Sequence, residues 1–159
     1  MINKTHLINY VIKPTLQKMS MYSKEAEQLL LVTAAIESVC GTYLHQIRGP
    51  ALGIYQMEPE TYHDVWNSVL HFSPKKTRRI KLIYPVDEIP HQYELMGNIN
   101  YATAIARIYY SRFAEPIPKC GSMKKIVDYY YRYWKPNPEK LSLESAITLA
   151  TKILGRNIC

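Results

Sequence analysis

Long apolar runs are absent from this sequence of 159 residues. No stretch approaches the roughly eighteen consecutive apolar residues that make up a membrane-spanning helix, so we expect no membrane span. Residues 1–10 contain Lys4 but no apolar segment that ends in small residues. We therefore expect synthesis in the cytoplasm without a signal peptide, and delivery by another factor if the protein works elsewhere.

Cysteine is scarce, and the three present (Cys40, Cys120 and Cys159) cannot all pair within one chain. They match no metal-site spacing, so we interpret them as free thiols in a reducing compartment. The five histidines are scattered and form no HExxH-type pair, and phosphate-loop and dinucleotide fingerprints are absent. The sequence thus predicts neither a metal site nor a cofactor.

Acidic residues are fewer than Lys and Arg, 13 against 20. The resulting net charge of +7 favours polyanionic partners such as nucleic acid, anionic lipid or bacterial cell wall. The densest basic segment, residues 75–81, is interpreted as a solvated helix face or a loop rather than a dedicated binding patch. Tyrosine is unusually abundant, with fourteen residues. Most of these rings are expected to pack at helix surfaces, although flat rings with a polar tip also suit sugar binding.

The spacing of apolar residues predicts one compact all-α domain over residues 1–159, with at most a short β element within residues 41–57. Helix-start and helix-stop residues give the expected boundaries. We expect helices over 4–13, ending at Pro14; from Ser23 to Gly41; from Pro59; from Asn98 to Pro116; from Ser122 to Pro136; and from Ser142 to Gly155.

The second of these helices carries a carboxylate in an unusual place. Ser23 is a suitable N-cap, and the chain then has no glycine or proline until Gly41. Helical steps of three and four residues lead from Ala26 to Glu37, so Glu37 lies on the buried side. A glutamate at a helix end can instead face solvent. The returning segment Gly53–Met57, with its glycine and amide, favours a buried acid whose pKa is raised and which can donate a proton near neutrality.

Several short motifs resemble those of a known family. The Glu37-Ser38 pair followed by the 53–57 segment is similar to the Glu-Ser and Gly-Ile-Tyr-Gln-Met type motifs of lytic transglycosylases of the soluble (SLT) type, which share the lysozyme-like fold. Asn98 resembles the asparagine of the Asn-Ile pair at the head of a long family helix, and the 129–134 cluster resembles the family's aromatic helix end. The resemblance covers roughly residues 14–154 and is greatest to small bacteriophage-encoded members. It departs from the family where Val39 and Cys40 precede Gly41, and where the usual tyrosine-asparagine-glycine ending is missing.

The resemblance implies Glu37 as the catalytic residue. It also implies that Ser38 holds the acid or the substrate, and that the 53–57 loop orients the N-acetyl groups of the sugars. It leaves open whether Tyr130, Tyr131 or Tyr133 faces the substrate. The substrate-binding residues that it implies are Ser38, Tyr55, Gln56, Met57, Asn98, Tyr101, Tyr130 and Tyr133.

The activity implied is cleavage of the β-1,4 bond between N-acetylmuramic acid and N-acetylglucosamine in peptidoglycan glycan strands, with one glutamate as acid and then base. Delivery to the periplasmic peptidoglycan would be by a virion or by a lysis partner that permeabilises the membrane.

Hydrolysis of the same bond by a muramidase remains an alternative, and it requires a second acid. Glu58, Glu60 and Asp64 are the nearby candidates, which we interpret as charges at a helix N-terminus. The other alternative is a non-catalytic basic virion protein or nucleic-acid-binding protein, although we expect no nucleic acid because no such motif is present.

Overall fold

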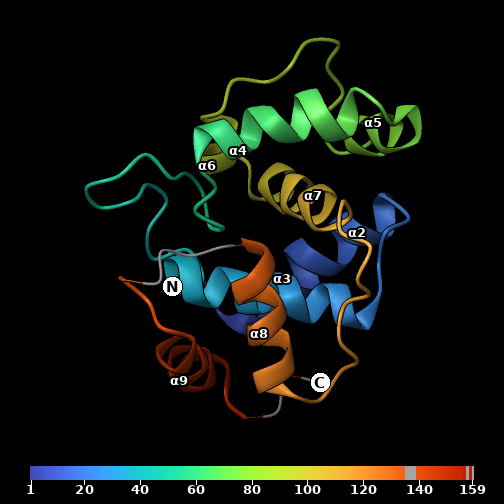
Figure 1. The fold of residues 1–159 in the computed structure, drawn as a ribbon. Coiled ribbons are helices and arrows are strands. Elements are labelled where there is room, and N and C mark those ends of the chain that lie inside the picture. Colours follow the sequence, from blue (N-terminus) through green and yellow to red (C-terminus); the bar gives the residue numbers. More distant parts are fainter. Residues whose placement is uncertain (135–138, 157, 159) are drawn as a thin grey trace.

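Two helices in mutual contact, α3 and α7, organise an all-α fold (Figure 1). The structure, a computed structural model, describes residues 1–134, 139–156 and 158. Helices α8 and α9 pack on α3, whereas η2, α5 and α6 pack on α7. The helices are α1 (Lys4–His6), η1 (Leu7–Ile12), α2 (Lys13–Lys18), α3 (Lys24–Ser38), α4 (Pro59–Asp64), η2 (Val65–Leu70), α5 (Pro74–Lys81), α6 (Glu94–Gly97), α7 (Ile99–Tyr110), α8 (Met123–Trp134) and α9 (Leu143–Leu154).

Helix α3 is buried on all sides, where the sequence pattern predicts a single buried face. Every residue of this helix is buried except Lys24 and Glu25 at its start and Glu37 at its end. A helix that is apolar all round belongs in the centre of a domain, and α3 contacts η1, α7, α8 and α9. The partial exposure of Glu37 therefore needs an opening in the surrounding shell at that point.

The predicted helix starts are confirmed, and most of the differences lie at helix ends. The side chains of Ser23, Asn98 and Ser142 accept hydrogen bonds from backbone N–H groups in the first turns of α3, α7 and α9. Helix α3 ends at Ser38, before Gly41, and α7 ends at Tyr110, well before the expected stop. The expected break at Pro136 and Pro138 lies outside the described residues.

The prediction that the first helix ends at Pro14 is wrong. Helical structure runs without a break through η1 and α2 to Lys18, and Pro14 occupies the first turn of α2. The preceding η1 segment has the wider π-helical geometry, in which the N–H of Lys13 bonds the carbonyl of Ile8, five residues back. Such a widened turn accommodates proline in a helix, because proline lacks an N–H and crowds the previous turn.

The 41–58 loop connects α3 to α4 and contains the short β element expected from the sequence. Isolated antiparallel bridges join His45 to Leu52 and Leu52 to Met57. The hydroxyl of Ser38 fixes this loop to α3, because it donates to the carbonyl of Ile54 at 2.6 Å and accepts from the N–H of Gly41 at 2.8 Å. The end of α3 and the loop therefore form one structural unit.

The interpretation of all three cysteines as free thiols is wrong. Cys40 is a buried free thiol, but Cys120 is disulfide-bonded. The cysteine content therefore no longer argues for a reducing compartment. Across the part of the chain that the structure describes, no helix has the length and apolar character to cross a bilayer.

Candidate active site

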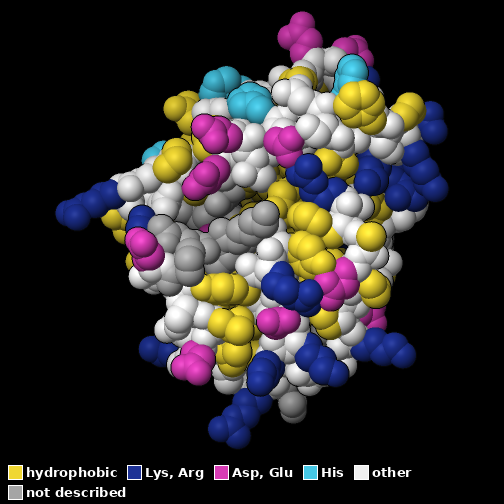
Figure 2. All heavy atoms as spheres, in the orientation of Figure 1, with side chains coloured by type: hydrophobic (Ala, Val, Ile, Leu, Met, Phe, Trp, Pro, Cys, Tyr) yellow, Lys and Arg dark blue, Asp and Glu magenta, His cyan; other side chains and the backbone are white. Residues whose placement is uncertain are grey.

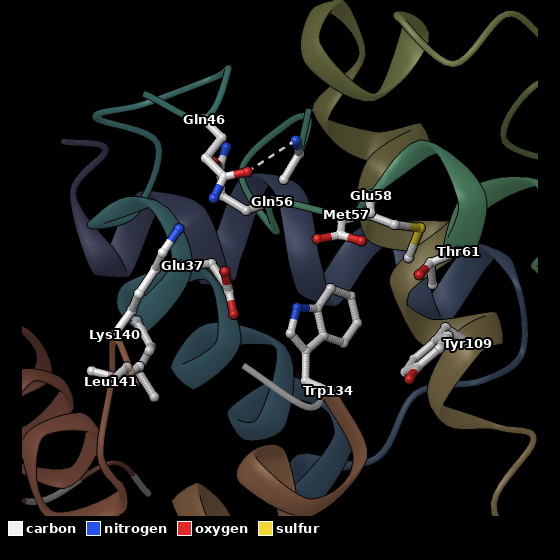
Figure 3. A pocket seen from close by; sticks show the side chains of 12 residues that line it. Glu37, Gln46, Gln56, Met57, Glu58, Thr61, Tyr109, Trp134, Lys140 and Leu141 are labelled. Atoms are coloured by element: carbon white, nitrogen blue, oxygen red, sulfur yellow. Dashed lines mark hydrogen bonds between the residues drawn. The ribbon is translucent and has the colours of Figure 1, made fainter. Parts of the chain in front are cut away.

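A cavity of about 510 Å³ opens beside the end of α3. Its walls come from α3, α4, α7 and α8, from the 41–58 loop and from residues 140–141, so residues far apart in the sequence meet there (Figure 3). The volume is in the range of sites that hold small ligands. The lining residues are Ile36, Glu37, Gln46, Ala51, Gln56, Met57, Glu58, Thr61, Tyr109, Trp134, Lys140 and Leu141.

Glu37 is the mostly buried carboxyl group of this cavity. It lies on the last turn of α3, one residue before the point where the helix is fixed to the loop. Burial raises the pKa of Glu37 to about 7; the hydrogen bond from Tyr130 opposes this rise, and the negative charge of Glu58 adds to it. Burial favours the neutral form of a carboxyl group, so Glu37 can hold a proton near neutrality.

Tyr130 is the one of the three candidate tyrosines that contacts Glu37. Its hydroxyl donates to Oε1 of Glu37 at 2.5 Å. Burial and the neighbouring carboxylate raise the pKa of Tyr130 above its usual range, which keeps the hydroxyl a donor. The hydroxyl of Tyr131 donates instead to the carbonyl of Leu141 at 2.9 Å, and that of Tyr133 bonds the carboxylate of Glu115.

A second carboxylate, that of Glu58, lines the same cavity. Figure 3 shows the side chains of Glu37, Glu58 and Trp134 all directed into it. Glu58 is exposed and precedes Pro59 at the start of α4, but its side chain makes no capping hydrogen bond there. Asp64 is instead paired with Arg112 at 2.5 Å. Of the acids considered from the sequence as a second acid, Glu58 is therefore the one that the fold brings to Glu37.

Two glutamine amides line the cavity from the 41–58 loop. Nε2 of Gln56 donates to the carbonyl of Gly53 at 2.8 Å. Oε1 of Gln46 accepts from the N–H of Ala51 at 3.3 Å, which is the bond dashed in Figure 3. These bonds leave an acceptor on Gln56 and a donor on Gln46. The pair matches the N–H and C=O of an amide ligand. Met57 lines the cavity beside them, as the sequence predicted for this segment.

Trp134 and Tyr109 form an aromatic wall of the cavity. Their rings meet edge to face, with centroids 5.0 Å apart, and the hydroxyl of Tyr109 donates to the carbonyl of Tyr133 at 2.6 Å. The ring of Tyr110 also packs against that of Trp134, with centroids 5.2 Å apart. A ring held in this way presents a fixed apolar face, which suits the flat face of a sugar.

Six of the eight residues predicted to bind substrate do not line the cavity, and two of these are Tyr130 and Tyr133, whose hydrogen bonds are given above. Ser38 is fully buried and bonds backbone groups, as described above. The hydroxyl of Tyr55 bonds that of Thr103 at 3.0 Å inside the core. Asn98 caps α7, and Tyr101 is buried with its hydroxyl 2.7 Å from that of Tyr62. Ser38, Tyr55, Asn98 and Tyr101 join the elements that carry the site and lie outside the cavity lining.

Some cavity residues have no sequence signal that would reveal them. Gln46 and Thr61 belong to none of the motifs, and neither do Lys140 and Leu141, which precede α9. Tyr109 lies on α7 and also belongs to none of the motifs. Their position in the cavity depends on how α4, α7 and α8 pack, which spacing along the chain does not specify.

Comparison with known proteins adds no identity to this geometry. No family model, curated protein or solved structure matches the chain. The described residues also contain no group of three or more His, Cys, Asp or Glu side chains that could hold a metal ion. The function must therefore be inferred from the chemistry of Glu37 and its neighbours.

Tyr130→Phe tests the contact with Glu37. Loss of the donated hydrogen bond removes an interaction that lowers the pKa of Glu37, so this pKa should rise above about 7. If Glu37 acts as a general acid, the basic limb of kcat/KM against pH should move to higher pH, by up to about one unit, with about a tenfold loss of kcat. Tyr129→Phe is the matched control, because it also removes one hydrogen bond, to the carbonyl of Glu115, without touching Glu37. An unchanged basic limb in Tyr130→Phe would contradict the assigned role.

Proposed function

We propose that this chain is a lytic transglycosylase that cleaves the β-1,4 bond between N-acetylmuramic acid and N-acetylglucosamine in peptidoglycan. The observation that carries the proposal is the carboxyl group of Glu37, which has a pKa of about 7 and lies in a cavity of about 510 Å³. A general acid works best when its pKa lies near the working pH. The motif resemblance around Glu37 supports the same reaction.

One carboxyl group can carry out both halves of this reaction. Protonated Glu37 gives its proton to the bridging oxygen, the C1–O bond breaks, and the N-acetylglucosamine leaves with a free 4-hydroxyl. The Glu37 carboxylate then takes the proton of the muramyl 6-hydroxyl, and the oxygen of that hydroxyl bonds to C1. This closes a 1,6-anhydro ring, consumes no water and returns Glu37 to its protonated state.

The remaining cavity residues match this substrate. The acceptor of Gln56 and the donor of Gln46 fit the amide of an N-acetyl group, and the Trp134 ring offers a face for a pyranose. Tyr130 holds the Glu37 carboxyl in place. In this proposal the protein reaches the periplasmic cell wall as part of a virion or after a lysis partner opens the membrane.

Muropeptide analysis tests the reaction directly. Purified sacculi treated with the protein should release fragments that end in 1,6-anhydro-muramyl residues. Each such fragment is lighter by one water, 18 Da, than the corresponding fragment with a hydrolysed reducing end. Mass spectrometry after digestion, alongside a zymogram, separates the two. Reducing ends that take up ¹⁸O from labelled water, without anhydro ends, would contradict the proposal.

A muramidase is the second candidate, and the position of Glu58 favours it. Two carboxylates in one cavity can divide the work of acid and base between them. If Glu58 activates water, Glu58→Gln should lose at least about 100-fold in activity. In a transglycosylase Glu58→Gln should keep most of its activity. Loss of the negative charge of Glu58 lowers the pKa of Glu37, so the basic limb of kcat/KM against pH should move to lower pH. Glu60→Gln, on the same helix start but outside the cavity lining, is the matched control.

A further inference from the structure

A second surface with its own chemistry lies on α5, outside the cavity. Five of its eight residues are Lys or Arg, and none is acidic. Figure 2 shows Lys and Arg side chains gathered where Figure 1 places α5. Lys75 and Arg78, three residues apart on one helix face, are both exposed. Neither makes an ion pair within residues 1–134, 139–156 and 158.

Apolar side chains accompany these charges on the surface. Phe72 is 76% exposed, Leu82 is 51% exposed and Ile89 is 48% exposed. A groove of about 490 Å³ adjoins α5, and its lining includes the apolar side chains of Trp66, Leu70 and Ile89 and the cationic side chains of Arg78 and Lys81. Large exposed apolar side chains next to a groove mark an interaction site more often than a solvated helix face.

Few acidic residues lie near this surface, and one of them forms an ion pair with a lysine of α5. Asp87 pairs with Lys81 at 3.1 Å, and Glu88 follows it in the loop after α5. Lys76 turns inward and donates to the carbonyl of Ser111 at 3.3 Å. Lys75 and Arg78 therefore carry the outward positive charge.

We propose that the α5 surface, defined by Phe72, Lys75, Arg78, Leu82 and Ile89, binds the anionic face of a phospholipid bilayer. Lys75 and Arg78 face the lipid phosphates, and the three apolar side chains enter the boundary between headgroups and acyl chains. This is the behaviour of a basic amphipathic helix that lies on a membrane without crossing it. Nucleic acid would use the positive charges but leave the apolar side chains without a role, so the bilayer accounts for more of the surface.

Vesicle co-sedimentation tests this inference with the full chain. The protein should bind vesicles of phosphatidylglycerol and phosphatidylcholine, bind phosphatidylcholine vesicles much more weakly, and lose affinity as salt rises. Each cation near an anionic membrane contributes about 1 kcal/mol, so Lys75→Glu together with Arg78→Glu should weaken binding by at least about 30-fold. Lys124→Glu with Lys125→Glu changes the same charge at exposed positions of α8 and should have an effect of less than about threefold.

A second pair of variants tests the apolar part. Phe72→Ser should weaken vesicle binding by about tenfold, whereas Tyr10→Ser, at a ring that is 72% exposed elsewhere, should not change it. Equal losses in test and control variants, or equal binding to zwitterionic vesicles, would overturn the proposal. So would a DNA duplex that binds more tightly than the vesicles and depends on Lys75 and Arg78. Digestion of lipid-free sacculi should be unaffected in all four variants, which keeps this test independent of the cavity.

Discussion

Glu37→Gln should lower the release of anhydro-muropeptides by about 10⁴-fold. Glutamine keeps the shape of the side chain and can still accept the hydrogen bond from Tyr130, but it can neither give nor take a proton. In the proposed reaction one side chain does both, so a single substitution removes two contributions of about 10²-fold or more each. Muropeptide release is measured by mass spectrometry under single-turnover conditions. Glu60→Gln should retain wild-type activity, and full activity in Glu37→Gln would exclude the proposed role.

The same variant should be more stable than the wild type at high pH, which shows that its inactivity is not a failure to fold. The pKa of Glu37 rises from 4.5 to about 7 on folding. Between these values the folded protein holds a proton that the unfolded chain has released, so the free energy of unfolding falls as pH rises. Glutamine does not titrate and escapes this loss. We expect equal melting temperatures near pH 4 and a gain of about 3 kcal/mol, or roughly 10 °C, at pH 8. A constant difference at all pH values would mean that Glu37 has an ordinary pKa.

Gly53→Ala should produce the largest loss of stability in the 41–58 loop. Gly53 has a φ of +75°, and a Cβ atom there would lie 2.2 Å from the backbone oxygen of Leu95. The left-handed backbone and the clash with main-chain atoms of α6 should together cost about 4 kcal/mol, or roughly 10 °C in Tm. Differential scanning calorimetry measures this loss.

Gly97→Ala is the matched control, since nothing lies within 4 Å of its added Cβ atom. It should change stability by less than about 1 kcal/mol. A Gly53→Ala protein that melts within 2 °C of the wild type would contradict the close approach of the loop to α6. Because the same loop carries Gln56 and Met57, we also expect weak substrate binding in Gly53→Ala at temperatures where it remains folded.

The helix starts could be predicted from the sequence because they depend on local chemistry. Ser23, Asn98 and Ser142 cap helices through hydrogen bonds that span only three residues. Helix ends were less predictable, because α3 ends in the left-handed region at Val39 (φ 52°) and not at a glycine. That backbone is unfavourable for a β-branched residue, so the tertiary contacts of the loop must stabilise it.

The candidate site divides in the same way. Glu37 was predictable because helical periodicity placed it beside buried residues and the next motif supplied a returning loop. The sequence could not show that Tyr130 is the tyrosine that contacts Glu37. Residues 129–131 are all tyrosine, and their three rings point in different directions from one helix. Only the packing of α8 against α3 decides which hydroxyl reaches Glu37. Ser38 and Tyr55, chosen from the sequence as substrate-binding residues, instead join elements of the core, so a resemblance between motifs need not mark a binding surface.

The hydrogen bond from Tyr130 restricts the orientation of the Glu37 carboxyl group. It engages one lone pair of Oε1 and so holds the plane of the carboxyl group relative to α8. In the proposed reaction the bridging oxygen leaves from the β face of the muramyl ring, and the 6-hydroxyl closes onto that same face, because the 1,6-anhydro bridge can form only there. A carboxyl group held in one orientation can therefore serve both oxygens in succession without rotating. The anomeric configuration is then retained without any nucleophile from the protein.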